Sequence, residues 1–294
     1  MTTRKPTTRL NLEPLETREV PTTLPTAGPA PTAANLYTRT TTTVAPVSPP
    51  GPDRFAVGYR TGGGAFGDVR VFQDSAHLLK EFRAYDLTVG ANRTLHVDRI
   101  SVVMADVTGD GVPDVITATD RVRDLNGGAA TTPPVKVFDG ATLGQPAPTV
   151  VRLLAPFGAA FTGGYAVAAG DFTGDGKADV AVSQSDAGAG RVRVFSGADL
   201  IDPFVWAPTA VAAFDGIGDP NGGGAVLAAG DVSGDRVPDL VAGAGAGPRV
   251  AVWDGTSLRA GQTPRRLVGD FFAFDPFPVT QELTNSTVSV RSAA

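Results

Sequence analysis

The sequence contains no cysteine and only two histidines, His77 and His96. Without cysteine, the chain can form no disulfide, no thiolate metal site and no cysteine nucleophile. Two histidines leave little scope for an imidazole zinc site or for histidine-based acid–base catalysis. The chain also lacks any apolar run near the roughly 18 residues that a membrane-spanning helix requires. We therefore do not expect an integral membrane protein.

Basic residues are outnumbered by acidic ones, 25 to 30, which gives a net charge of −5 and disfavours nucleic acid as the main partner. Glycine and proline, in contrast, are abundant, with 36 and 24 copies among 294 residues. This composition favours many short strands and turns over helices. A hydrophobic content of 42% is typical of a globular chain that buries a core.

Residues 1–52 differ in composition from the remainder of the chain. Threonine and proline fill 24 of these 52 positions, so the segment lacks the apolar content that would offset the entropy of ordering it. It also lacks the apolar core of an ordinary secretory signal. We expect residues 1–52 to be a disordered targeting segment and linker, and residues 53–294 to form the folded domain.

A nine-residue aspartate-rich segment occurs three times, at residues 106–114, 171–179 and 231–239, with starts 65 and 60 residues apart. Other phrases repeat in step with it. An apolar run precedes each segment, a Val/Arg run ending in an aromatic occurs four times, and a second aromatic phrase follows at residues 82–86, 154–157, 211–215 and 271–275. Each unit of about 60 residues then holds four strand candidates, the number in a propeller blade. The sequence predicts an all-β fold, a β-propeller of four four-stranded blades.

The two ends of residues 53–294 complement each other in this pattern. Residues 287–293 copy the innermost-strand phrase, and residues 53–58 copy the strand that follows an aspartate loop. Pairing the C-terminal strand with the N-terminal blade would close the ring and hide its edges. A ring completed by a partner, or an open assembly, is the alternative.

The repeated segment has the donor pattern of a calcium loop. Ca²⁺ prefers six to eight oxygen ligands, and oxygens at positions 1, 3, 5 and 9, with a carbonyl at position 7, can wrap one ion. The predicted ligands are Asp106, Thr108, Asp110, the Val112 carbonyl and Asp114; Asp171, Thr173, Asp175, the Lys177 carbonyl and Asp179; and Asp231, Ser233, Asp235, the Val237 carbonyl and Asp239.

The alternative is that these loops are hairpin turns without metal, because Asp and Gly form Asx-turns unaided. Against it, three carboxylates in each tight loop repel one another unless a cation neutralises them. Residues 53–294 carry 20 basic and 27 acidic residues, a balance of −7 that three Ca²⁺ ions would nearly cancel. We expect two or three structural Ca²⁺ ions. Arg236 replaces the turn glycine of the third loop, so that site is the weakest prediction.

These loops resemble those of FG-GAP (VCBS-type) repeats, the calcium-binding blades of integrin alpha-subunit heads and of many bacterial surface proteins. The resemblance covers residues 53–294 and implies a propeller. Thr or Ser at position 3, where the family more often has Asp or Asn, implies weaker metal binding.

Residues 9–21, RLNLEPLETREVP, resemble the short N-terminal segment that opens many exported proteins of planctomycete bacteria. This second resemblance implies a secreted or cell-surface location. A disordered amphipathic stub without a targeting role is the alternative.

Two functional hypotheses follow. The first is a non-catalytic binding module for an extracellular protein or glycan, with the irregular segments at residues 121–134 and 141–148 as candidate contact loops. The second is a carbohydrate-active enzyme, a polysaccharide lyase or glycosidase, which needs two carboxylates outside the metal loops. Candidates for that pair are Glu81, Asp86, Asp98, Asp202 and Asp215. We favour the first hypothesis because Asp86 and Asp215 fall at equivalent repeat positions, which indicates a role in turns.

Overall fold

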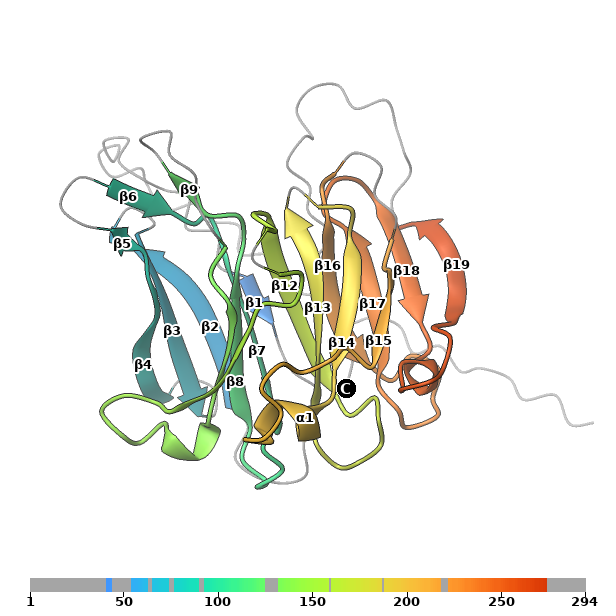
Figure 1. The fold of residues 1–294 in the computed structure, drawn as a ribbon, viewed down its shortest axis with the longest axis horizontal. Helices are drawn as coiled ribbons and strands as arrows, with labels where there is room; N and C mark the ends of the chain where they lie inside the picture. Colours follow the sequence, from blue (N-terminus) through green and yellow to red (C-terminus); the bar gives the residue numbers. More distant parts are fainter. Residues whose placement is uncertain are drawn as a thin grey trace, which may run out of the picture. The chain divides into compact units, whose positions relative to one another are not determined.

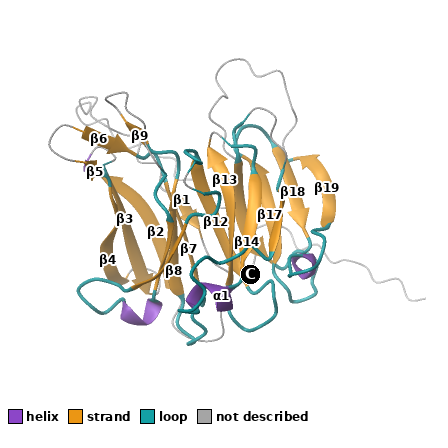
Figure 2. Cartoon of the chain, viewed as in Figure 1, coloured by secondary structure: helices purple, strands orange, loops and turns teal. Residues whose placement is uncertain are grey.

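The computed structural model describes residues 41–43, 54–62, 65–73, 77–89, 93–124, 132–158, 160–186, 188–217 and 222–273. Contacts divide the chain into Met1–Tyr37 and Thr38–Ala294, and all described residues belong to the second unit. Strands make up most of its regular structure, and the helical turns are short (Figure 2). Among the described helices, none has the length and apolar character needed to cross a membrane.

The first of four four-stranded antiparallel sheets has the strand order β1-β2-β3-β4 (Figure 1). Its strands are β1 (Thr41–Thr43), β2 (Arg54–Thr61), β3 (Phe66–Gln73) and β4 (His77–Asp86). β1 pairs with β2 so that Thr42 lies opposite Val57. The linker expected over residues 1–52 therefore includes a short strand, formed from β-branched threonines that favour extended backbone. β1 occupies the edge of β2 that was predicted to pair with residues 287–293. Those residues lie outside the described part of the chain.

The other three large sheets repeat this order along the chain. The second contains β7 (Ile100–Ala105), β8 (Asp114–Thr119), β10 (Val135–Phe138) and β11 (Val150–Leu154). The third contains β12 (Gly164–Gly170), β13 (Asp179–Asp186), β14 (Arg191–Phe195) and β15 (Ala212–Asp215). The fourth contains β16 (Ala225–Gly230), β17 (Asp239–Ala244), β18 (Arg249–Trp253) and β19 (Arg266–Phe272). Four strands in each repeat unit, as predicted, are confirmed.

Shorter elements join these sheets. A three-stranded sheet is formed by β5 (Thr88–Val89), β6 (Arg93–His96) and β9 (Arg123–Asp124). The connections between third and fourth strands contain the 3₁₀ turn η2 (Gly140–Thr142), the helix α1 (Gly197–Ile201) and the 3₁₀ turn η3 (Gly255–Ser257).

The apolar patterns of the strands explain their positions. All seven residues of β12 are buried, which is expected of a strand covered on both faces. In β14, Val192 and Val194 are buried whereas Arg191 and Arg193 are exposed, the period-two pattern of a strand with one covered face. Apolar clusters fill the spaces between consecutive sheets, and the strands β2, β7, β12 and β16 pack in that order. Among the described strands, the first and fourth sheets share no comparable interface.

Candidate functional site

The three aspartate loops connect the first and second strands of the second, third and fourth sheets. In each loop, position 1 directly follows the first strand and position 9 begins the second strand. All fifteen residues predicted as ligands lie in the described part of the chain, five in each loop. The loops therefore lie at the same end of their respective sheets.

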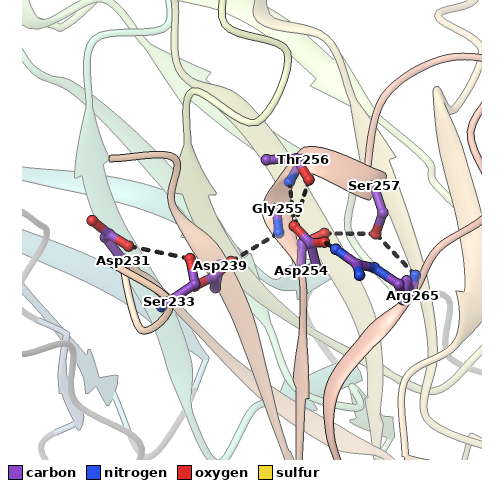
Figure 3. Close-up of polar contacts among 8 residues, drawn as sticks. All are labelled: Asp231, Ser233, Asp239, Asp254, Gly255, Thr256, Ser257 and Arg265. Carbon is purple, nitrogen blue, oxygen red and sulfur yellow. Dashed lines mark hydrogen bonds and ion pairs between the residues drawn. The ribbon is translucent and has the colours of Figure 1, made fainter. Parts of the chain in front are cut away.

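The position-9 aspartate of each loop is fully buried. In the first loop, Asp114 Oδ2 accepts hydrogen bonds from the backbone N–H groups of Val107 (2.9 Å) and Thr108 (2.8 Å). Its Oδ1 accepts from the backbone N–H of Gly140 (2.8 Å), at the start of η2. Matching bonds to the start of the next connection join Asp179 to Gly197 (2.9 Å) and Asp239 to Gly255 (2.9 Å; Figure 3). This carboxylate thus ties the loop to the connection between the third and fourth strands.

The glycine whose N–H donates to this carboxylate has no room for a side chain. A Cβ atom at Gly140, Gly197 or Gly255 would collide with the carbonyl oxygen of the position-8 residue of its loop. Each glycine follows an aromatic residue and then Asp or Ser, as in Phe138-Asp139-Gly140. This repeated signal lies outside the loops, and the predicted site omitted it.

The position-1 aspartate closes the turn of its loop. Asp106 Oδ1 accepts from the N–H groups of Gly109 (2.6 Å) and Asp110 (3.1 Å), and its Oδ2 accepts from Gly111 (2.8 Å). Asp110, at position 5, accepts from the Val112 N–H at 2.8 Å. The same pattern recurs at Asp171 and Asp175 and at Asp231 and Asp235.

Three of these aspartates, Asp114, Asp179 and Asp231, have shifted pKa values. Burial raises the pKa of Asp114 and of Asp179 to about 6, although backbone N–H donors oppose this shift by favouring the ionised form. The exposed Asp231 differs, because the backbone N–H of Arg236 contributes most to holding its pKa below the usual value.

The sixth position of each loop requires a left-handed backbone. Gly111 has φ 83° and Gly176 has φ 84°, a region that glycine enters without a steric penalty. Arg236 holds the same position of the third loop at φ 72°, the one positive φ found at a non-glycine residue in the described ranges. The third loop therefore keeps the shape of the other two at a conformational cost.

The chemistry of the donor set fits a hard divalent cation, because each loop supplies three carboxylates, one hydroxyl and a carbonyl, all oxygen ligands. In the described residues, however, no three acidic or histidine side chains gather in a group that could hold a metal ion. Their oxygens instead accept backbone N–H groups. Oxygens that accept a single N–H, such as Asp106 Oδ2 and Asp110 Oδ1, keep a lone pair that could ligate a cation.

Basic side chains from the following sheet reach the first two loops. Lys177, itself in the second loop, donates from Nζ to the Thr108 carbonyl of the first loop at 2.8 Å. The neighbouring Ala178 N–H donates to the Asp106 carbonyl at 2.7 Å. Arg259 donates from Nε to the Phe172 carbonyl of the second loop at 2.9 Å. The predicted role of Lys177 was limited to its carbonyl, whereas its ammonium group serves the neighbouring loop.

The five carboxylates considered for an enzyme are all engaged in local structure. Glu81 accepts from Tyr59 (2.5 Å) and Arg70 (2.8 Å). Asp98 pairs with Arg123 (2.9 Å) and lies 3.4 Å from His96. The other three are Asp86, which accepts from Thr88; Asp202, which accepts from the Phe204 N–H; and Asp215, which pairs with Arg191.

The predicted contact segments are described in part. Residues 141–148 run from η2 toward β11 and are exposed at 144–147, although Leu143 is buried. Residues 125–131 of the other segment lie outside the described ranges. Among the described residues, the most exposed aromatic side chains lie elsewhere, at Phe204 and Trp206 between α1 and β15. In the sequence, these two aromatics lie close together between Pro203 and Pro208. This pattern could have indicated an exposed aromatic pair, but it was not used in the prediction.

A search of curated proteins found no sequence similar to this chain. Comparison with protein-family models gave a match to the FG-GAP repeat over residues 163–195. The matched region contains β12, the second aspartate loop, β13 and β14, so it includes the geometry described above. The family resemblance predicted from the aspartate loops is thereby confirmed: this chain contains an FG-GAP repeat.

Proposed function

We propose that the protein is a non-catalytic, calcium-stabilised binding module whose four sheets are blades of a β-propeller. The observation that carries the proposal is the aspartate loop, which recurs three times with the same hydrogen bonds and lies within the FG-GAP match at its second occurrence. FG-GAP repeats typically bind Ca²⁺ and build propellers. Two or three structural ions and a closed ring belong to this proposal. Because β1 holds the edge of β2 expected for residues 287–293, pairing through those residues is not part of it.

The buried aspartates support a structural role for the metal. In a chain without cysteine, Asp114, Asp179 and Asp239 connect separate segments of their sheets in place of covalent links. A cation bound to the loop would offset the mutual repulsion of its three carboxylates. The exposed carboxylates at position 5 would complete such a site.

The setting of the module is part of the same proposal. The resemblance of residues 9–21 to planctomycete export segments supports a secreted or cell-surface location. There, an extracellular protein or glycan is the proposed partner. The local pairing of Glu81, Asp98 and Asp215 supports a binding role over a catalytic one.

Thermal unfolding of the full chain in EDTA, Mg²⁺ and Ca²⁺ tests the proposal. Saturation at 100 times the dissociation constant adds about 2.7 kcal/mol, so Ca²⁺ should raise Tm by several degrees. Asp110→Asn combined with Asp175→Asn should reduce the rise, because asparagine keeps the acceptor oxygen but removes the charge. Asp139→Asn, outside the loops, is the matched control. A Tm that is the same in Ca²⁺ and EDTA would contradict a calcium-binding role.

A further inference from the structure

Two aromatic side chains project from the connection between α1 and β15. Phe204 is 93% exposed and Trp206 is 92% exposed, more than any other large apolar side chain in the described residues. Single exposed apolar residues are common on protein surfaces. Two nearly fully exposed aromatics two positions apart are different, because each gives up most of the free energy that burial would provide.

The connection that carries them is held in place by one arginine. From β11, the Arg152 guanidinium donates to the carbonyls of Leu200 (2.5 Å), Asp202 (2.9 Å) and Val205 (3.1 Å), and to a fourth carbonyl, that of Asp199. The Asp202 side chain also accepts from the Phe204 N–H at 2.8 Å. The aromatic side chains are therefore presented by a backbone that is already ordered, which lowers the entropy lost when a partner binds.

The charged side chains of this connection are acidic. Residues 197–211 include Asp199 and Asp202 but no lysine, arginine or histidine. The neighbouring cations, Arg152 and Lys177, direct donors to main-chain carbonyls. The carboxylates of the second loop lie at the same end of the sheet, because Asp179 accepts from the first residue of α1, Gly197. The connection that presents the two aromatics therefore carries two carboxylates and no basic side chain of its own.

We propose that Phe204 and Trp206, with Asp199 and Asp202, form a docking site for a protein partner that presents arginine or lysine side chains. A guanidinium or ammonium group over a Trp or Phe face is attracted by the ring, and nearby carboxylates add charge complementarity. Anionic partners are disfavoured by the same carboxylates. The inference rests on the proposed binding function and names its surface and the chemistry of its partner.

The two tryptophans of the chain provide a direct measurement. Trp206 is exposed, whereas Trp253 is buried and donates to the Gly216 carbonyl at 2.8 Å. Subtracting the spectrum of Trp206→Phe from that of the wild type isolates the Trp206 emission. The probes are an acetylated Gly-Arg-Gly-Arg-Gly peptide amide, the same peptide with citrulline in place of arginine, and a set of neutral hexasaccharides.

We expect the arginine peptide to change Trp206 emission saturably, with a response that weakens as salt is added. Phe204→Ala, and Asp199→Asn combined with Asp202→Asn, should each weaken binding about two- to fivefold. Phe272→Ala removes an exposed aromatic from β19 and should leave binding unchanged.

Three results would overturn the inference: an equal response to the citrulline peptide, a response limited to hexasaccharides, or no response to the arginine peptide at millimolar concentrations. Circular dichroism melts of each variant separate loss of binding from loss of folding. A failed Ca²⁺ effect on Tm would reject the calcium module without affecting this measurement, so the two proposals can fail independently.

Discussion

The first and third aspartate loops share a sequence pattern and internal hydrogen bonds, but they differ in what covers them. At position 2, Val107 of the first loop is 0% exposed, whereas Val232 of the third loop is 58% exposed. Lys177 and Ala178 from the third sheet contact the first loop, whereas the third loop belongs to the last described sheet. The nine-residue motif thus sets the internal geometry of a loop, and the next sheet sets its environment.

The largest difference in stability between the first and third loops is expected when the buried position-9 carboxylate is removed. Asp114→Ala leaves the N–H groups of Val107, Thr108 and Gly140 without their acceptor, at a cost of about 3–5 kcal/mol. Asp239→Ala should cost less, about 2–3 kcal/mol, because water can reach part of its exposed loop. Urea denaturation of both variants in EDTA measures the two losses. Equal losses would show that cover by the next sheet is unimportant.

The covered loops should also make the metal-free protein sensitive to pH. Because burial raises the pKa of Asp114 and Asp179 to about 6 in the folded state, both acids bind protons more tightly there than in the unfolded chain. Their contribution to stability is therefore complete below about pH 4 and is lost as pH rises through 6. Between pH 5 and pH 7 the expected loss is about 3 kcal/mol for the pair. Denaturation midpoints in EDTA between pH 5 and pH 7 measure this loss.

Ca²⁺ should reverse the direction of this pH dependence, because the ion binds the ionised carboxylates. Asp114→Asn and Asp179→Asn should each flatten the metal-free profile. A stability that rises from pH 5 to pH 7 in EDTA would show that the backbone N–H donors outweigh burial at these carboxylates.

A smaller effect is expected from the basic side chain that reaches across the sheets. Lys177→Met removes the ammonium group bonded to the Thr108 carbonyl and should cost about 1–2 kcal/mol in EDTA. It should also increase the stabilisation by Ca²⁺, because a positive charge beside the first loop is lost. Lys80→Met, which removes a comparable bond from β4 to the Pro146 carbonyl, is the control for the metal effect. A Ca²⁺ response that is equal in both variants would count against this interpretation of Lys177.

The smallest effect is expected from exchanging the residue types at position 6 of the first and third loops. Arg236→Gly should stabilise the protein by about 1 kcal/mol, because it removes a side chain from a left-handed backbone position. Gly111→Arg should destabilise it by a similar amount; a Cβ there meets no atom within 4 Å, so the effect is conformational and not steric. Thermal melts of both variants, with Arg236→Lys as the control, check that the two changes have opposite signs.

Much of the strand pattern was predictable because it repeats. The Val/Arg runs fall on β3, β10, β14 and β18, and the apolar runs before the loops fall on β7, β12 and β16. Each run has an in-phase copy elsewhere in the chain, so a single ambiguous segment could be identified from the others. β1 is formed by a run of threonines that has no in-phase copy elsewhere in the chain. The sequence therefore did not predict this strand.

The candidate site was predictable at the level of residue types but not of contacts. The spacing identified Asp106, Asp110 and Asp114 as one group, yet it could not show that they accept backbone N–H groups. The reach of Lys177 to a neighbouring loop depends on how two sheets pack, which no local pattern encodes. Phe204 and Trp206 lie outside the repeated phrases, and their exposure is a property of the folded surface.

The partners of the buried aspartate have a consequence for how such a gene can change. Asp114 bonds to Val107, Thr108 and Gly140, so every group that it satisfies is encoded within one repeat of the sequence. A duplicated repeat would carry its own complete set of these bonds, and a deleted repeat would leave none of them broken in its neighbours. Contacts that cross repeats, such as that of Lys177 with Thr108, can then diverge afterwards. Recombination can thus alter the number of sheets while each surviving loop keeps its internal structure.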